Sequence, residues 1–403
     1  MKAQKNCCEI ALDLKTYYAG QNQATHPNVI AFEEPWHGYR YYMAYTPYPY
    51  ANGFEENPCL AASNDLIHWE KPEGLINPIA CAEENQCDEL KDSHLLYRKD
   101  TDQLEMWYLG RLNSDMQHGG SLYCFRKVSD DGIHWQSRQT MYRFSEFNLA
   151  SPTIVWDESG YHFWGIRNSK AFTGLYYMHS TDGIEWSNLQ QCVVPLAEQT
   201  HMWHGALTFN EGVWYFVWVG NQGVSRNQIY LSVSSDGKQF SQPQIIVTND
   251  TGWDYLYRPV LLKDHGVFYC FYGVIRCDNR WLIGMSRGLC VESLVGVSVR
   301  DIPYDGDRIS TTTKLKLKCC ILHVTGLLVP RMMLLMPIVL ILQLLSGSIL
   351  ISTAGAIILC MIVYIRFDSK RFFAGGIMMG LLCAVSANYV YSLLVELLAL
   401  FPF

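Results

Sequence analysis

The sequence has no Cys-x-x-Cys pair, although 14 of its 403 residues are cysteine. Structural zinc sites usually gather their thiolates through such short spacings, so the cysteines give no indication of a zinc site. Residues 1–25 also lack the apolar stretch of a secretory signal peptide. Free thiols without a signal peptide favour a reducing compartment. These patterns predict neither a metal nor another cofactor.

Positive charge is scarce in the first three quarters of the chain. Residues 1–309 carry 24 Lys and Arg against 36 Asp and Glu, a net charge of −12. An acidic protein repels phosphate backbones, which argues against nucleic acid as a partner. From residue 310 onward the balance reverses to seven basic and two acidic residues. These basic residues flank apolar segments, where anionic lipid headgroups would attract them.

A turn pattern recurs along the acidic part of the chain. It reads Ser-x-Asp-Gly followed by an aromatic residue three positions later, with Leu66 in place of glycine in the first copy. The four copies begin at Ser63, Ser129, Ser180 and Ser234, at spacings of 66, 51 and 54 residues. Asp-Gly between two extended runs is a strong signal for a turn between strands, because glycine supplies the positive φ that such turns need.

Each turn is preceded by an aromatic and β-branched run, and each run by a short apolar strand. The apolar strands begin at His26, Asp92, Ser151, His204 and Arg258. A fifth unit ends near residue 287, where the spacing holds although the turn has diverged. Three or four strands per unit, repeated five times at a period near 50 residues, predict an all-β, five-bladed β-propeller over residues 25–309. Residues 1–24 form an N-terminal extension.

This strand and turn pattern resembles the five-bladed propellers of glycoside hydrolase families 32, 43, 62, 68 and 130, over about residues 25–300. In such enzymes the innermost strand of each blade starts at a central funnel and delivers the catalytic groups. The resemblance implies a carbohydrate or glycoconjugate as the partner. It also implies three carboxylates, one at the start of each of the first three blades.

The sequence matches one of those three carboxylates. Asp92 fills the position in blade two, whereas His26 and Ala150 occupy the positions in blades one and three. Hydrolysis of a glycosidic bond needs two carboxyl groups on opposite sides of the bond. Glu56, just before Asn57 and Pro58, is therefore the second catalytic candidate beside Asp92.

Other polar and aromatic residues near strand starts are candidates for substrate binding. Several histidines and one arginine in a funnel suit an anionic group such as phosphate or a uronic acid, as in the phosphate-using enzymes of family 130. Flat tryptophan rings near blade ends suit stacking on sugars, a role that Trp203 and Trp253 could share. The binding candidates are His26, His94, His204, Arg258, Asp254 and Trp36.

Three functions remain open at this stage. The first is a glycoside hydrolase or a glycoside phosphorylase-like enzyme that uses carboxylates in the funnel. The second is a non-catalytic glycan-binding propeller descended from such an enzyme, which the residues His26 and Ala150 favour. The third is a propeller that binds another protein.

Two long uncharged stretches, residues 332–365 and 372–395, follow a basic linker at residues 310–331. A helix needs about 20 apolar residues to span a bilayer. Residues 332–403 are therefore expected to form a transmembrane α-helical hairpin with spans near residues 343–365 and 373–395. A turn at residues 346–348 would give three helices. Basic residues flank both ends of the first span, so the topology is open, but the missing signal peptide favours a cytoplasmic propeller at the membrane.

Overall fold

The computed structural model describes residues 5–16, 21–83, 87–113, 121–169, 172–196, 200–220 and 227–298. These residues all belong to the first of two units into which the chain divides, residues 1–312 and 313–403. Within the described part, no helix is both long enough and apolar enough to cross a membrane. The expected spans at 343–365 and 373–395 lie outside the described residues.

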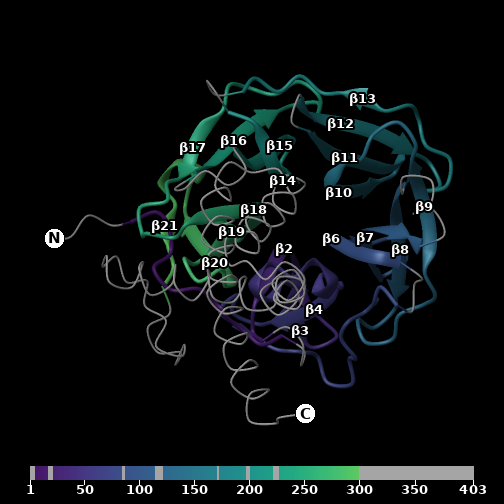
Figure 1. Cartoon of the computed structure of the whole chain (residues 1–403), viewed down its shortest axis with the longest axis horizontal. Coiled ribbons are helices and arrows are strands. Elements are labelled where there is room, and N and C mark those ends of the chain that lie inside the picture. Colours follow the sequence, from purple (N-terminus) through teal and green to yellow (C-terminus); the bar gives the residue numbers. More distant parts are fainter. Residues whose placement is uncertain are drawn as a thin grey trace, which may run out of the picture. The chain divides into compact units, whose positions relative to one another are not determined.

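Five antiparallel sheets surround a common axis, with the first strand of each sheet innermost (Figure 1). Blade one contains β2 (Ala24–Trp36), β3 (Tyr39–Pro47) and β4 (Cys59–Ser63). Blade two contains β6 (Cys87–Arg98), β7 (Gln103–Leu112), β8 (Leu122–Ser129) and β9 (Gln139–Phe144). Blade three contains β10 (Ala150–Asp157), β11 (Gly160–Asn168), β12 (Thr173–Ser180) and β13 (Gln190–Gln191). Blade four contains β14 (Met202–Asn210), β15 (Val213–Gly220), β16 (Ile229–Ser234) and β17 (Gln244–Val247). Blade five contains β18 (Tyr255–Asp264), β19 (Val267–Ile275), β20 (Trp281–Gly288) and β21 (Val295–Gly296). The predicted five-bladed β-propeller is confirmed.

The N-terminal segment joins the last blade to the first. The Trp253 indole donates a hydrogen bond to the carbonyl of Cys8, and the Leu12 amide donates to the carbonyl of Ile283 in blade five. The segment then forms β1 (Asp13–Leu14), which pairs in parallel with β5 (His68–Trp69) of blade one. These bonds tie the two ends of the ring together.

The repeated turn follows the third strand in blades one to four. Its serine hydroxyl bonds the aspartate two residues later, at 3.1, 3.2, 3.0 and 2.8 Å in the four copies. The same aspartate accepts hydrogen bonds from two backbone amides further along, such as those of Ile133 and His134 at 2.8 and 2.7 Å. The glycines have φ values of +74°, +78° and +68°. Side-chain bonds and positive φ thus fix the same turn four times.

Each innermost strand contains a register shift near its start. The shifts lie between Thr25 and Asn28, Lys91 and His94, Ala150 and Thr153, Met202 and His204, and Tyr257 and Val260. His26, Asp92, Ser151 and Arg258 have φ values of +55°, +55°, +54° and +27° there. Positive φ is uncommon outside glycine, and bulges of this kind often redirect side chains at active sites.

Hydrogen bonds between neighbouring innermost strands fix the positions of the strands next to these bulges. The Leu95 amide donates to Asn28 Oδ1 at 2.8 Å, and the Leu207 amide donates to Thr153 Oγ1 at 3.2 Å. Between blades two and three, His94 Nε2 lies 3.1 Å from the amide of Ile154. His94 therefore joins two blades.

Candidate functional site

Five side chains at or next to the register shifts come together at the propeller axis, where the innermost strands β2, β6, β10, β14 and β18 lie (Figure 1). We call this group the axial cluster. It consists of His26, Asp92, Ser151, His204 and Arg258. These residues are only 1%, 2%, 2%, 7% and 1% exposed. Polar side chains at that depth need partners, and the cluster and the residues around it supply most of them.

Asp92 and Arg258 form a buried ion pair in the axial cluster. Arg258 Nη1 lies 2.5 Å from Asp92 Oδ1, and the Ser151 amide donates to Asp92 Oδ2 at 3.1 Å. Burial acts to raise the pKa of Asp92, but the charge of Arg258 and the neighbouring histidines hold it well below its usual range. Asp92 is therefore an oriented, ionised carboxylate.

The two histidines flank this carboxylate. His26 Nε2 lies 3.4 Å from Asp92 Oδ1, and His204 Nδ1 lies 3.9 Å from the same atom. Burial lowers the pKa of His26 well below its usual range and that of His204 to about 4, despite the opposing effect of Asp92. Both imidazoles are therefore neutral at pH 7, the form in which a ring nitrogen can bind a metal ion.

His26, Asp92 and His204 have the chemistry and spacing of a metal site. Each offers one ligand atom, and these atoms lie within 4.8 Å of one another. Tetrahedral coordination with bonds of about 2.0–2.1 Å separates ligand atoms by roughly 3.4 Å. Two histidines and one carboxylate are a common set in hydrolytic metal sites, which keep a coordination position open. These residues fit a divalent metal ion.

The outer contacts of the three residues also fit such a site. His26 Nδ1 lies 2.9 Å from Thr46 Oγ1, and His204 Nδ1 lies 2.6 Å from Ser151 Oγ. Arg258 and the Ser151 amide fix the carboxylate of Asp92. Metal-binding side chains are usually oriented by hydrogen bonds of this kind.

Two further groups lie against the axial cluster. Glu56 Oε1 lies 3.5 Å from His26 Nδ1, and burial together with the charge of Asp92 raises the pKa of Glu56 well above its usual range. The Tyr257 hydroxyl lies 2.8 Å from His204 Nε2 and 3.2 Å from His26 Nε2. Glu56 thus holds a proton more tightly than an exposed carboxylate does, and Tyr257 contacts both imidazoles.

The structure brings most of the sequence candidates together. Asp92, Glu56, His26, His204 and Arg258 all meet at the axis. Asp254 lies just before β18, four residues from Arg258. His94 instead bonds the backbone of Ile154, and burial lowers its pKa to about 3.

The tryptophan candidates lie away from the cluster or are buried. Trp36 ends β2, ten residues beyond His26, and its indole donates to Asp102 at 2.8 Å. A strand rises about 3.3 Å per residue, so Trp36 lies near the opposite end of the blade. Trp36 therefore lies away from the axial cluster, and its role in sugar stacking stays a prediction. Trp203 and Trp253 are 8% and 2% exposed and pack in the core.

The sequence analysis missed Ser151, Tyr257 and Thr46. Ser151 occupies the same bulge position as Asp92 and starts one of the five predicted strands, so the repeat itself was a usable signal. Tyr257 directly precedes Arg258 but sits among many other tyrosines in strands. Thr46 ends β3, and nothing in its sequence context distinguishes it.

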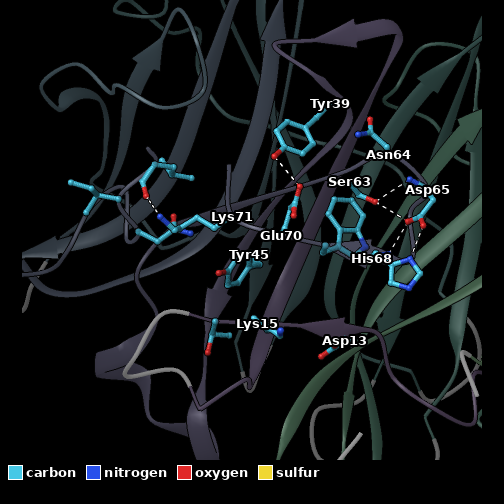
Figure 2. A pocket seen from close by; sticks show the side chains of 15 residues that line it. Asp13, Lys15, Tyr39, Tyr45, Ser63, Asn64, Asp65, His68, Glu70 and Lys71 are labelled. Atoms are coloured by element: carbon cyan, nitrogen blue, oxygen red, sulfur yellow. Dashed lines mark hydrogen bonds and ion pairs between the residues drawn. The ribbon is translucent and has the colours of Figure 1, made fainter. Parts of the chain in front are cut away.

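A separate hollow of about 780 Å³ lies at the outer edge of blade one (Figure 2). Several of the polar groups that line it bond one another. The Tyr39 hydroxyl donates to Glu70 at 2.9 Å, and Asp65 Oδ2 lies 2.6 Å from His68 Nδ1 in the repeated turn. No member of the axial cluster lines this hollow. The convergent, buried chemistry of the axis makes it the stronger candidate site.

Comparison with known proteins finds similar sequences and the same architecture elsewhere. No family model matches the sequence. A curated relative, the A type blood N-acetyl-alpha-D-galactosamine deacetylase of Flavonifractor plautii, is 26% identical over 348 residues, which cover 70% of this chain. The match spans 44% of the length of that relative.

Two solved structures share the propeller fold. An N-acetylgalactosamine deacetylase from F. plautii, in complex with blood group B trisaccharide, superposes with a TM-score of 0.62 at 22% identity, covering 70% of this chain and 95% of the other. A thermostable family-43 glycoside hydrolase gives a TM-score of 0.52 at 14% identity, covering 72% and 95%. At these identities the likeness shows the fold.

Proposed function

We propose that this propeller removes the acetyl group from an N-acetylated amino sugar of a glycan, using a divalent metal ion held by His26, Asp92 and His204. The observation that carries the proposal is the convergence of these three side chains, from blades one, two and four, within 4.8 Å. The activity named for the F. plautii relative supports the choice of substrate bond.

A divalent ion at this position would polarise an amide carbonyl and lower the pKa of bound water. The residues of the chain would supply orientation and proton transfer. Arg258 and the Ser151 amide hold Asp92 ionised and fixed in direction, and Thr46 and Ser151 orient the two imidazoles. Such a preformed arrangement lowers the reorganisation needed during reaction.

Glu56 is the proposed general base and acid. Its carboxyl lies against His26, and its raised pKa makes its carboxylate a stronger base. In hydrolysis of the amide, Glu56 takes a proton from the attacking water as the new C–O bond forms. It then gives that proton to the nitrogen as the C–N bond breaks, so that acetate and an amine leave.

A glycoside hydrolase is the second candidate. The specific observation in its favour is that the pKa values of Glu56 and Asp92 are shifted in opposite directions, as for an acid and its partner in glycosidases. His26 lies between these carboxyls, however, within 3.5 Å of Glu56 and 3.4 Å of Asp92. The imidazole occupies space where a glycosidic bond would have to fit, which favours deacetylation.

The two candidates release different products. The full chain is incubated with N-acetyl-α-D-galactosaminides and a panel of other N-acetylated and arabinose-containing oligosaccharides, with and without added Zn²⁺ or Mn²⁺. We expect acetate and a free amine, with the glycosidic bonds intact. Release of a free sugar or, with inorganic phosphate present, a sugar phosphate would instead support a hydrolase or phosphorylase. Glycan binding with no product under any condition would support a non-catalytic propeller.

We further propose that the apolar stretches at 332–365 and 372–395 anchor the propeller to a membrane. The support is their length without charge and the basic residues that flank them. We expect the full chain to stay in the membrane pellet after carbonate extraction, with the propeller accessible to protease from the cytoplasmic side. Recovery in the supernatant would contradict the anchor.

A further inference from the structure

Two aromatic side chains are exposed on the connection between β3 and β4 of blade one. Tyr50 belongs to the short 3-10 helix η1 (Pro49–Ala51) and is 52% exposed. Phe54 belongs to η2 (Gly53–Glu55) and is 74% exposed. Most other aromatic rings of the described chain are packed in the cores between blades. We call Tyr50 and Phe54 the rim aromatics.

The backbone beneath the rim aromatics is strained and firmly held. Tyr50 and Ala51 have φ values of +52° and +64°, a conformation that costs free energy for residues with a side chain. The Tyr50 amide donates to Gln23 Oε1 at 3.0 Å, and Asn279 Nδ2 of blade five donates to the Tyr50 carbonyl at 2.9 Å. Strain that is held in place by such bonds is common at ligand-binding sites.

The same connection delivers Glu56 to the axial cluster. Phe54 precedes Glu56 by two residues, so their Cα atoms are at most about 7.6 Å apart. The helix η2 lies beside β6, which carries Asp92, and η1 lies beside β20. The rim aromatics therefore stand at the funnel end of blade one, a short distance from the proposed reaction centre.

We propose that Tyr50 and Phe54 form a sugar-stacking subsite, which binds the glycan units next to the amino sugar that enters the funnel. The inference rests on the proposed function. Exposed aromatic rings bind apolar faces, and each pyranose presents such a face through its C–H groups. Because the backbone at Tyr50 is already held in its strained conformation, little ordering is needed when the sugar binds. The subsite would select an oligosaccharide over the single sugar.

The test compares two probes on the full-length protein. One probe is methyl N-acetyl-α-D-galactosaminide, and the other is the blood group A trisaccharide, which ends in the same sugar. Affinity is measured by calorimetry and acetate release by enzyme assay. The variants are Phe54→Ala, Tyr50→Ala and the conservative Phe54→Trp. Phe209→Ala is the control, because Phe209 is 49% exposed but lies at the far end of β14.

Phe54→Ala and Tyr50→Ala should each weaken trisaccharide binding by about tenfold and raise its KM similarly, with kcat unchanged. Binding of the single sugar should not change, Phe54→Trp should restore the affinity, and Phe209→Ala should have no effect. Equal losses on both probes, or no loss on either, would overturn the subsite, as would a wild-type protein that binds neither probe. Trisaccharide binding that depends on Phe54 without acetate release would retain the subsite and reject the proposed function.

Discussion

The end of each blade that carries the Ser-x-Asp-Gly turn and the end at the propeller axis differ in which features recur from blade to blade. At the turn end, the same Ser and Asp make the same bonds in four blades, within 2.8–3.2 Å for the hydroxyl–carboxylate contact. At the axis, a register shift recurs in all five innermost strands, with a positive φ beside it in four of them. The side chains there differ: blades one and four supply histidine, and the other three supply aspartate, serine and arginine. The repeated chemistry closes each sheet, whereas the varied chemistry builds one shared site.

We infer that the residues at the turns serve stability and those at the axis serve function. The hydroxyl and carboxylate bonds of a turn lie within its own blade, so losing them weakens one local structure. The axial cluster exists only when the whole ring closes, because its members come from all five blades. Variants at the turn end should therefore change stability without changing activity. Variants at the axis should affect activity first, and the predictions below test that separation.

The largest effect is expected for Asp92→Asn. Changes to outer contacts of a metal site typically cost 10–100-fold, and loss of a ligand carboxylate should cost more, about a thousandfold in kcat/KM for acetate release. The variant also leaves Arg258 buried without its partner, which should lower the free energy of unfolding by about 3–5 kcal/mol. Both quantities are measured, by assay and by urea denaturation.

His204→Gln is the companion to Asp92→Asn, because it keeps the Arg258–Asp92 pair intact. It should lose similar activity with a smaller loss of stability. If both variants remained active while correctly folded, the axis would not be the reaction centre.

The next effect is expected for Glu56→Gln. Removing a general acid–base group typically costs about 10²–10⁴-fold in kcat. Because the amide retains the shape of the carboxyl, KM and metal content should stay close to wild type. Glu55→Gln, one residue away, serves as the matched control and should keep full activity. Equal behaviour of the two variants would remove Glu56 from the mechanism.

A turn-end variant should show the opposite pattern. Gly183 has φ +78°, and a Cβ there would meet Met141 Cε at 2.9 Å. Gly183→Ala should lower the free energy of unfolding by about 1–3 kcal/mol, with kcat/KM unchanged. Gly212 has a similar φ of +80°, but a Cβ there would meet nothing within 4 Å. Gly212→Ala therefore measures the free-energy cost of the positive φ alone, without a steric clash. A change in kcat for Gly183→Ala would show that the two ends are coupled.

The smallest effect concerns acid stability at the turns. Burial acts to raise the pKa of Asp65, but hydrogen bonds from His68 and the backbone lower it to about 2. A depressed carboxyl pKa adds stability above the unfolded value of about 3.9, and that stability is lost as the pH falls towards 2. Since the side chain is half exposed, the contribution should stay below about 1 kcal/mol.

Asp65→Asn should therefore reduce the loss of unfolding free energy between pH 4 and pH 2. Urea denaturation at several pH values measures this slope. Glu158→Gln, at an exposed position, provides the control and should keep the wild-type slope. An unchanged slope in Asp65→Asn would contradict the role of the turn hydrogen bonds.

The sequence predicted the fold because each repeat has a recognisable pattern both at its turn and at the start of its first strand. The Ser-x-Asp-Gly turn gave the period, and the strand starts at His26, Asp92, Ser151, His204 and Arg258 are the residues that the structure brings to the axis. The spacing alone does not show that the blades close into a ring; that followed from the general architecture of β-propellers. Residues equivalent in the repeat became neighbours in space.

The chemistry of the site was harder to predict, because a metal set drawn from three blades has no local signature. His26 and His204 are separated by 178 positions in the sequence, far outside the short spacings by which metal motifs are recognised. The position of Trp36 relative to the site was hard to predict for a related reason. The sequence placed Trp36 near a blade end but did not show which of the two ends, and the structure puts it at the end away from the axial cluster.

Metal analysis of the purified full-length protein tests the central claim most directly. After exhaustive dialysis, plasma mass spectrometry should find about one divalent metal ion per wild-type chain. His204→Gln should hold less than a tenth of that amount, and acetate release should follow the bound metal on removal and re-addition. A wild-type protein that hydrolyses its glycan after complete metal removal, or a His204→Gln variant that retains the ion, would contradict a metal site at the axis.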